Sequence, residues 1–354
     1  MKKKVLVAMS GGVDSAVAAV LLLNIGYSVT GITMCLGTSD EEGQAKCCGM
    51  NAINDALAVC NNINVSHHII DFTKDLRESV IDRFVMEYKS GRTPNPCIDC
   101  NRYLKFGRLL KMARAMGFDY LATGHYARIV KYEEGYCLMK AKDKAKDQTY
   151  FLYPINKDDL PDILFPLGDY TKQEIREIAY KTCLPVAQKA ESQDICFVNN
   201  GGYGQFLKKR RGIVKPGLIV DIRGKELGTH MGIAFYTVGQ RHGIGIPAKS
   251  PLYVVAVNAP ENKIIVGTKK DLMSKSLYSD SFNLLVDHIP ARAEGKIRYR
   301  KTAAACSISS SGTRIRIDFD EPQESITPGQ AVVLYSGERV IGGGIIDEVI
   351  NGTG

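Results

Sequence analysis

Hydrophobic and polar positions alternate along the N-terminal part of the chain in a way that predicts strands and helices in turn. Short apolar runs predict strands at Val5–Ala8, Ser28–Met34, Val65–Ile70 and Tyr120–Thr123. Between them, apolar residues recur every three or four positions and predict helices at Ala16–Leu23, Met50–Cys60, residues 75–89 and Phe106–Met116. Nearly continuous apolar strands that alternate with helices are typical of a parallel sheet covered on both faces. The sequence therefore predicts an α/β N-terminal domain.

The pattern changes near residue 200, after which strands dominate. The strands are predicted at Tyr253–Val257, Lys263–Val266, Thr313–Phe319, Ala331–Tyr335 and Val340–Ile346. In one of them Ile315, Ile317 and Phe319 alternate with charged residues, as in a half-buried strand. We therefore expect an α/β domain over residues 1–202, a small mixed central domain over 203–272 and a C-terminal β-barrel over 273–354.

Composition narrows the class of protein but not its function. The 354 residues are 45% hydrophobic and 24% charged, which is ordinary for a globular protein. No apolar run reaches the roughly 18 residues of a membrane span, and Met1–Lys4 leads into a strand and not into a signal segment. We expect a cytoplasmic protein with no membrane partner. The net charge of +8 is compatible with a nucleic-acid partner without requiring one.

Ten cysteines in a chain of this kind argue against a disulfide scaffold and favour redox, metal or sulfur chemistry at some of them. Cys60 and Cys183 fall in apolar helical patterns, so we expect them in the core. Cys47 and Cys48 end a polar loop, and their spacing alone assigns them no function.

The stretch Ser10-Gly11-Gly12-Val13-Asp14-Ser15 follows the first strand and opens the first helix. In this geometry backbone N–H groups and a helix N-terminus converge on an anion, beyond the carboxyl end of the sheet where ligands bind. Gly11 and Gly12 let the backbone approach a phosphate, and Ser10 and Ser15 add hydroxyl donors. The lysine of the common P-loop is missing, which disfavours transfer of a γ-phosphate.

Four further strings stand out. Gly91–Asn101 contains two prolines that stiffen a loop and a C-x-x-C pair, Cys97 and Cys100. No second pair at zinc spacing accompanies it, so alone it fits a redox site, a metal site or chance. The others are Gly124–Arg128, Lys146–Phe151 and Ala190–Phe197, which contains Cys196. Taken singly, each is compatible with an ordinary turn or a buried cysteine.

Taken together, these strings resemble the bacterial tRNA-specific 2-thiouridylases (MnmA, or TrmU), within the PP-loop ATP pyrophosphatases. The resemblance extends through Tyr236–Gly243, Ile297–Arg300 and Pro328–Val332 and covers essentially the whole chain. It implies that ATP adenylates the C2 oxygen of the wobble uridine in the tRNAs for Lys, Glu and Gln, and that sulfur then replaces this oxygen. It also implies contact with the anticodon stem-loop and a cysteine desulfurase or sulfur-relay protein as donor.

The resemblance assigns roles residue by residue. ATP, with Mg²⁺ on its phosphates, falls on Ala8, Met9, Ser10, Gly11, Gly12, Val13, Asp14, Ser15, Met34 and Gly124. Contacts with the target base and the tRNA fall on Asn95, Pro96, Cys97, Lys146, Asp147, Gln148, Arg298 and Tyr299. The catalytic positions are Asp14, Cys97, Cys100 as the nucleophile and Cys196 as the cysteine that receives persulfide sulfur. With two cysteines, one can carry sulfur and the other release it by forming a disulfide.

One departure from the family pattern leaves the sulfur mechanism open. The common pattern has Asp where this chain has Cys97. Cys97, Cys100 and Cys196 are a possible three-ligand set for a [4Fe–4S] cluster whose open iron would hold hydrosulfide. The alternatives are therefore a cysteine persulfide and a cluster. A third, a tRNA-binding protein without catalysis, is disfavoured by the intact Gly-rich loop and the three cysteines.

Overall fold

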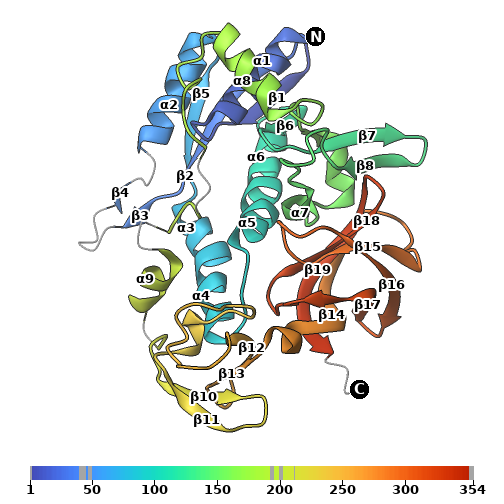
Figure 1. The fold of residues 1–354 in the computed structure, drawn as a ribbon. Coiled ribbons are helices and arrows are strands. Elements are labelled where there is room, and N and C mark those ends of the chain that lie inside the picture. Colours follow the sequence, from blue (N-terminus) through green and yellow to red (C-terminus); the bar gives the residue numbers. More distant parts are fainter. Residues whose placement is uncertain are drawn as a thin grey trace. The chain divides into compact units, whose positions relative to one another are not determined.

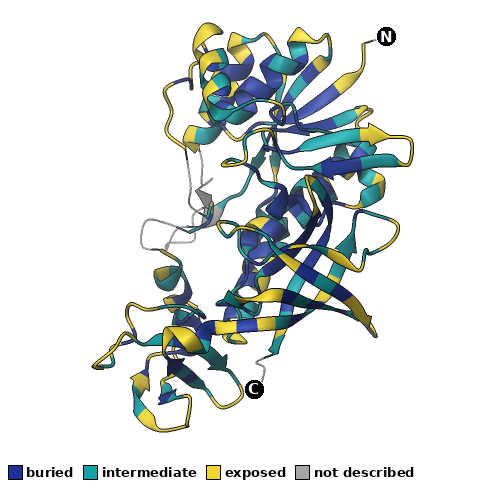
Figure 2. Cartoon of the chain, turned by 45° about the vertical axis from the view of Figure 1, so that its right-hand side comes forward, coloured by how far each residue is buried: buried dark blue, intermediate teal, exposed yellow. Residues whose placement is uncertain are grey.

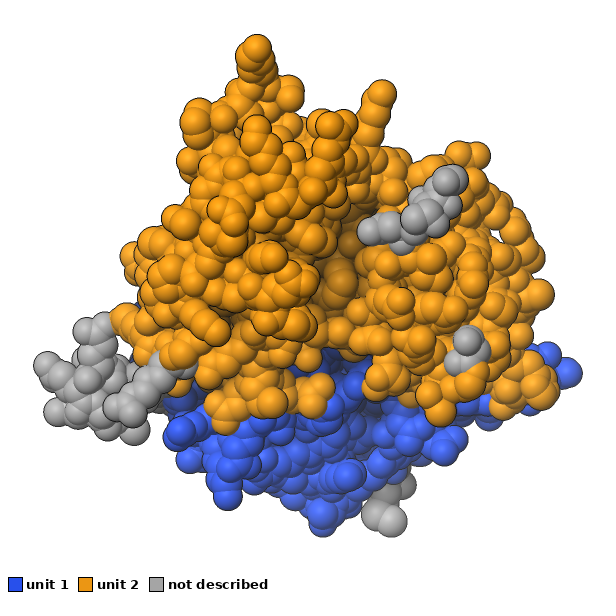
Figure 3. Space-filling model, turned by 90° about the horizontal axis from the view of Figure 1, so that it is seen from below, with its two compact units in different colours: residues 1–80, 97–197, 338–340 blue, residues 81–96, 198–337, 341–354 orange. Residues whose placement is uncertain are grey.

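The computed structural model describes residues 2–39, 45–46, 50–191, 195–198, 202–210 and 212–350. The chain forms two compact units (Figures 1 and 3). Unit 1 comprises Met1–Val80, Cys97–Phe197 and Glu338–Val340, and unit 2 comprises Ile81–Pro96, Val198–Gly337 and Ile341–Gly354. No helix within the described ranges has the length and apolar character needed to cross a membrane.

Unit 1 is built on a five-stranded sheet in which every neighbouring pair is parallel. The strand order is β5 (His67–Asp71), β2 (Ser28–Cys35), β1 (Lys4–Ala8), β6 (Tyr120–Thr123) and β9 (Ile163–Leu164). The helices α1 (Val13–Asn24), α2 (Met50–Asn62) and α8 (Lys172–Lys181) contribute buried residues to the same hydrophobic cluster as the strands. This cluster includes Val17, Val59, Cys60, Ile175 and Ala179. The predicted parallel α/β sheet is confirmed.

Helices occupy both stretches predicted between β5 and β6, residues 75–89 and Phe106–Met116, but the region is divided differently from the expectation. It contains α3 (Thr73–Leu76), the π-helix η1 (Arg77–Ile81), α4 (Asp82–Lys89), α5 (Pro96–Asp99), the π-helix η2 (Cys100–Leu109) and α6 (Leu110–Ala115). Cys97 and Cys100 were expected on a loop, but they lie in α5 and at the start of η2. The reason is Pro96, because a proline is well suited to the first position of a helix, where its missing N–H costs nothing.

Other elements of unit 1 carried no clear signal in the sequence. The hairpin of β7 (Arg128–Tyr132) and β8 (Gly135–Met139) follows β6, and α7 (Thr149–Leu152) and the 3₁₀-helix η3 (Lys157–Asp162) come next. The short strands β3 (Thr38–Ser39) and β4 (Ala45–Lys46) pair where a loop was expected. Cys47 and Cys48 lie outside the described residues. Cys183 is exposed and not in the core, because α8 ends at Lys181 and the chain turns with φ 49° at Cys183.

Unit 2 contains two β-structures. The central one has the order β11 (Glu226–His230), β10 (Gly217–Asp221), β13 (Lys263–Gly267) and β12 (Tyr253–Asn258), with α9 (Gly202–Lys208), η4 (Ile233–Phe235) and η5 (Lys269–Leu272) beside it in sequence. The C-terminal one comprises β14 (Met273–Leu284), β15 (Arg292–Lys296), β16 (Ala304–Ser311), β17 (Arg314–Glu324), β18 (Ala331–Ser336) and β19 (Arg339–Ile350). It closes into a barrel because β14 pairs with both β17 and β19.

The barrel core follows the predicted alternation of side chains. Ile315, Ile317 and Phe319 are buried, whereas the charged residues between them are only partly covered. Figure 2 shows buried and exposed stretches alternating along the strands. Unit 2 also includes the segment Ile81–Pro96, which pairs with later parts of the same unit. The rings of Tyr88 and Tyr203 stack with centroids 5.3 Å apart. The stretch that leads to the C-x-x-C pair is therefore part of unit 2.

Candidate active site

The Ser10–Ser15 loop joins β1 to α1. Gly11 has φ +67°, and a Cβ atom there would lie 2.3 Å from the carbonyl oxygen of Ala52, so only glycine fits. The Ser15 hydroxyl accepts a hydrogen bond from the Ser10 amide (3.1 Å) and lies 3.1 Å from the Ser10 hydroxyl. The N-cap residue of α1 is Gly12, which has no side chain with which to cap the helix. The first amide groups of α1 are thus directed toward whatever anion the loop binds.

The other predicted ATP residues lie around this loop. A Cβ atom on Gly124 would lie 2.7 Å from the Ser15 amide nitrogen, so the segment after β6 packs directly on the first turn of α1. Met9 is buried, and its amide donates to the carbonyl of Ile32 on β2 (2.7 Å). Met34 is half-buried near the carboxyl end of the same strand. Ala8 is the last residue of β1.

Two lysines that the sequence analysis missed bring positive charge to the loop. Lys172, at the start of α8, lies 158 positions after Asp14 and places its Nζ 2.7 Å from Asp14 Oδ1. Lys189 donates to the carbonyl oxygen of Gly11 at 2.8 Å. These cations come from distant parts of the chain, so no local motif could reveal them. Both lysines also pair with carboxylates, Lys172 with Asp14 and Lys189 with Asp55, so the positive charge reaches the loop as part of ion pairs.

Asp14 and Glu191 hold Lys172 between them. Lys172 Nζ lies 3.0 Å from Glu191 Oε1, and the Tyr126 hydroxyl donates to Asp14 Oδ1 at 2.9 Å. The hydrogen bond from Lys146 (2.7 Å) and the neighbouring Lys172 lower the pKa of Glu191 to about 2. Burial, reinforced by the Asp14 charge, raises the pKa of Tyr126, which keeps this phenol protonated as a donor. The loop is therefore bordered by a fixed network of charges.

The three residues Lys146, Asp147 and Gln148 have protein partners in this structure. Asp147 is buried and accepts hydrogen bonds from the Ala141 amide (2.9 Å) and the Thr149 hydroxyl (2.6 Å). Gln148 Oε1 accepts from the amide of Tyr126 at 2.9 Å. These contacts brace the segment that carries Gly124 and Tyr126.

Arg298, predicted to contact tRNA, lies in unit 2 and is also held by protein groups. Its Nη2 donates to the carbonyls of Val238 (2.9 Å) and Ser325 (3.0 Å) and to the Thr327 hydroxyl (2.6 Å). The next residue, Tyr299, is half-buried. Contact of either residue with RNA remains a prediction.

The three cysteines of the predicted sulfur site all belong to unit 1. Surrounding protein raises the pKa of Cys97 and Cys100, although the Cys97 side chain is itself exposed. The same effect raises the pKa of Cys196 to about 12, and the Cys100 and Cys97 thiols contribute to this rise. Cys97 lies in α5 and Cys100 begins η2, so these two thiols are close in the chain, and their charges also act on Cys196.

Comparison with known proteins identifies the family. Family models match residues 3–200 (tRNA methyl transferase HUP domain), 204–268 (tRNA methyl transferase PRC-barrel domain) and 274–346 (Aminomethyltransferase beta-barrel domain). The tRNA-specific 2-thiouridylase MnmA 1 of Syntrophus aciditrophicus (strain SB) is 54% identical over 351 residues, which cover 99% of this chain and 94% of that protein. The tRNA-specific 2-thiouridylase MnmA of Moorella thermoacetica is 48% identical, and the match covers 97% of this chain and 99% of that protein. The chain belongs to the MnmA family.

Membership in the MnmA family confirms the resemblance seen in the sequence. The fold agrees as well, with a parallel-sheet PP-loop domain, a central PRC-barrel domain and a C-terminal β-barrel. The roles assigned to individual residues of this MnmA-family chain remain predictions.

The cysteine neighbourhood was tested as a metal site. Thiolates are the donors that iron–sulfur clusters require. However, among the residues that the structure describes, no group of three or more His, Cys, Asp or Glu side chains is arranged to hold a metal ion. The type of donor fits a cluster, but the arrangement of Cys97, Cys100 and Cys196 does not. The chemistry below is therefore derived from thiols.

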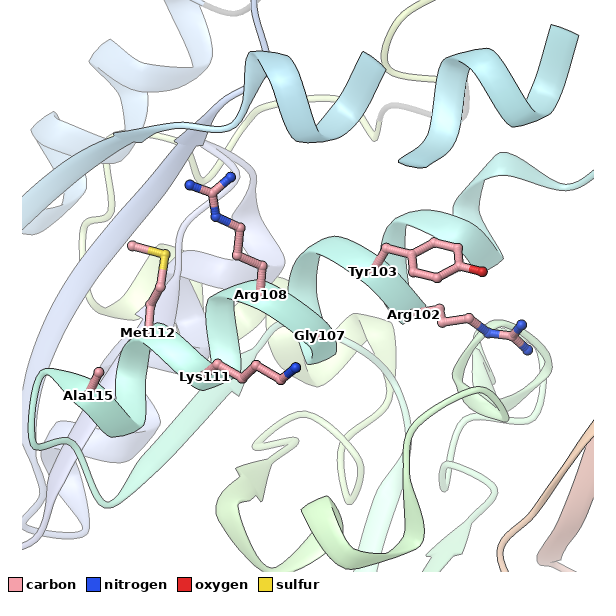
Figure 4. Close-up of a pocket in the computed structure, with 7 residues that line it drawn as sticks. All are labelled: Arg102, Tyr103, Gly107, Arg108, Lys111, Met112 and Ala115. Carbon is pink, nitrogen blue, oxygen red and sulfur yellow. The ribbon is translucent and has the colours of Figure 1, made fainter. Parts of the chain in front are cut away.

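A basic hollow of about 650 Å³ lies along η2 and α6 (Figure 4). It is lined by Arg102, Tyr103, Gly107, Arg108, Lys111, Met112 and Ala115. Arg108 pairs with Asp75, and its guanidinium lies over the ring of Phe72, 4.9 Å from the centroid. Figure 4 shows Arg102 and Lys111 extending from the other side of the helix. This basic surface directly follows Cys100 in the chain.

Proposed function

We propose that this protein is an ATP-dependent tRNA-uridine 2-sulfurtransferase that converts the wobble uridine of the tRNAs for Lys, Glu and Gln to 2-thiouridine. One observation carries the proposal: a single compact unit holds both the phosphate-binding loop Ser10–Ser15 and the three cysteines Cys97, Cys100 and Cys196. The family models carry methyltransferase in their descriptions, whereas the relatives are named 2-thiouridylases. A phosphate-binding loop and three cysteines in one compact unit favour ATP activation followed by sulfur transfer.

In the first step the uridine C2 oxygen attacks the α-phosphorus of ATP, which forms a C2–O–AMP bond and releases pyrophosphate. The amides of the Ser10–Ser15 loop and of the α1 N-terminus bind the phosphates, and Lys172 and Lys189 offset their charge. Asp14 already accepts hydrogen bonds from Lys172 and Tyr126. Mg²⁺ would be held by the ATP phosphates, with Asp14 as the carboxylate of the loop, and would supply charge neutralisation for the leaving pyrophosphate.

In the second step sulfur replaces the activated oxygen. A cysteine desulfurase or relay protein first loads Cys196 as a persulfide. The terminal sulfur attacks C2, AMP leaves, and a C2–S–S–Cys196 linkage forms. The Cys100 thiolate then attacks Cys196 Sγ, which forms a Cys100–Cys196 disulfide and releases the C2 thiocarbonyl. A dithiol reductant must reduce this disulfide before the next turnover.

The proposal extends to how the chain is divided and how it holds tRNA. Residues 1–202 carry catalysis, 203–272 contact tRNA, and 273–354 form the barrel. Asn95, Pro96 and Cys97 meet the target base, which must leave its stack to reach them. The side chains Lys146, Gln148, Arg298 and Tyr299 adjoin the anticodon stem-loop, held mainly through its phosphates.

A second candidate mechanism performs the same reaction with hydrosulfide on a [4Fe–4S] cluster. Its support is the donor type alone, because Cys97 adds a third thiol to Cys100 and Cys196, whereas the arrangement of the three in this structure does not fit a cluster. Cys97→Asp separates the two mechanisms, because a carboxylate is a poorer ligand for cluster iron than a thiolate. The protein is purified without oxygen and assayed for iron, sulfide and visible absorbance. Full activity of Cys97→Asp without iron supports the persulfide, and iron-dependent activity lost by this change supports the cluster.

The test of the function uses the full chain with unmodified tRNA, ATP, a cysteine desulfurase and cysteine. Released nucleotides are separated, and digested tRNA is analysed for 2-thiouridine by mass spectrometry. We expect AMP and pyrophosphate only when tRNA is present. Cys100→Ser is expected to keep AMP formation and lose 2-thiouridine. Release of ADP and phosphate, or thiolation without ATP, contradicts the proposal.

A further inference from the structure

The helix that begins at the predicted nucleophile is a π-helix. The helix η2 runs from Cys100 to Leu109, and its hydrogen bonds join each residue to the fifth one along. Cys100 and Lys105 are five residues apart, so this pattern places them on one face. In an ordinary α-helix with 3.6 residues per turn the same two side chains would point about 140° apart. The π-helix therefore places Lys105 on the same face of the helix as Cys100.

The sequence of η2 maintains this wide turn. A Cβ atom on Gly107 would lie 2.6 Å from the carbonyl oxygen of Arg102, five residues earlier, so the helix needs glycine there. At the other end, buried Asn101 donates from Nδ2 to the carbonyl of Phe151 at 2.9 Å and anchors the first turn. Long π-helices are rare, and π-bulges occur frequently at functional sites.

Lys105 is held in place by its own contacts. Its Nζ lies 3.4 Å from Nε2 of His125, whose Nδ1 lies 2.7 Å from the Thr123 hydroxyl. The ring of His125 is packed against Phe106 and Phe165, with centroids 5.9 Å and 6.0 Å away. Burial and the Lys105 charge hold the pKa of His125 well below its ordinary value. The imidazole is therefore neutral and can accept a hydrogen bond from the ammonium group.

We propose that Lys105 is the positioning residue for sulfur transfer, and that the π-helix sets its register with Cys100 so that the ammonium group stabilises sulfur anions during the reaction. This inference rests on the proposed function. Lys105 also lowers the pKa of Cys97, Cys100 and Cys196, against the rise caused by burial, while the Asp99 charge opposes it at Cys100. The ammonium group stabilises two sulfur anions. One is the Cys100 thiolate that attacks Cys196 Sγ, and the other is the sulfur bonded to C2, which is released from Cys196 in this step. Lys105 transfers no proton and forms no bond.

The test compares Lys105→Met, Lys105→Arg and Gly107→Ala, with Lys181→Met as a control for the loss of a lysine from an exposed position on α8. Two rates are measured on each protein: tRNA-dependent AMP release and single-turnover formation of 2-thiouridine. We expect Lys105→Met to release AMP at the wild-type rate and to slow thiolation by about tenfold or more, because a nearby opposite charge is lost. Lys105→Arg keeps the charge and is expected to recover most of the rate.

Gly107→Ala leaves Lys105 intact but crowds the Arg102 carbonyl, so it is expected to reproduce the slow thiolation of Lys105→Met. Thermal unfolding confirms that each variant is folded. Wild-type thiolation by Lys105→Met, or Lys105→Arg as slow as Lys105→Met, overturns the inference. Alkylation of Cys100 by iodoacetamide needs neither tRNA nor ATP and is expected to slow in Lys105→Met. The alkylation rate therefore tests whether Lys105 acts on Cys100 even if the enzyme forms no 2-thiouridine. A lack of 2-thiouridine would contradict the proposed function but not this inference.

Discussion

Replacing Lys172 with methionine tests the charge network around the phosphate-binding loop. The ammonium group of Lys172 lies 2.7 Å from Asp14 and 3.0 Å from Glu191. Methionine keeps most of the length of the side chain and removes the charge. The carboxylates of Asp14 and Glu191 then face one another with only Tyr126 and Lys146 as partners in the described network.

The expected loss of stability follows from the exposure of the three side chains. Breaking a fully buried ion pair costs about 3–5 kcal/mol, and breaking an exposed one costs about 0–1 kcal/mol. Lys172 is 13% exposed, whereas Asp14 and Glu191 are 33% and 29% exposed. The network lies between these limits, so we expect a loss of about 1–2 kcal/mol. Adenylation should slow by about 10²–10³, the usual effect of removing one preorganised electrostatic group.

The assay follows tRNA-dependent AMP release and the urea midpoint of unfolding for the same preparation. Lys142→Met is the matched control, because Lys142 forms a comparable ion pair with Glu174 but both side chains are about half exposed. We expect the control to release AMP normally and to lose less than about 1 kcal/mol. A Lys172→Met protein that releases AMP at the wild-type rate with an unchanged KM for ATP would refute the assignment of this lysine to the phosphates.

Three further outcomes follow from the structure. Gly124→Ala should lose ATP binding and unfold at lower temperature, because its Cβ would lie 2.7 Å from the Ser15 amide nitrogen; equal melting points and AMP rates would contradict this. Arg298→Ala should cost about 1–3 kcal/mol by leaving three acceptors without their donor, and should flatten the salt slope of tRNA binding by about 0.7–0.9; an unchanged slope would remove Arg298 from the interface. The pKa of Glu191 is about 2 when folded against 4.5 as its ordinary value, so its contribution to stability is complete above pH 4.5 and is lost as the pH falls toward 2. Urea midpoints of wild type and Glu191→Gln should therefore converge in acid.

The strands and the loop could be predicted because each is encoded locally. Most residues of Val5–Ala8 and Tyr120–Thr123 are buried in a parallel sheet, so neither run contains a charged residue. The Gly-rich loop was also visible, since Gly11 is required by a positive φ and by its distance from Ala52.

Lys172 and Lys189 were missed because they reach the loop from 158 and 178 positions away. Lys172 also opens a helical pattern, in which a lysine normally indicates a solvated face. The helical setting of Cys97 was missed for a different reason. Two prolines read as loop residues, but Pro96 takes the first position of α5. The π-helix at Cys100–Leu109 could not be predicted, because periodicity of apolar residues does not resolve one extra residue per turn over so short a segment. Cys183 followed the helical pattern, but the chain leaves α8 two residues before it.

The membership of Ile81–Pro96 in unit 2 limits how the enzyme can be dissected. Phe84 and Tyr88 are almost completely buried, and their rings pack against Phe206 and Tyr203. A fragment that stops near residue 200 would retain Phe84 and Tyr88 but remove both partner rings. Each aromatic side chain that becomes exposed loses up to about 1.5–3 kcal/mol of the free energy gained by its burial. The destabilised segment leads directly into Cys97. An ATP-binding fragment made in this way would therefore be inactive in sulfur transfer through misfolding alone. The loss of activity in such a fragment would then be wrongly attributed to the removed strands, although the cysteines proposed to transfer sulfur are still present in the fragment.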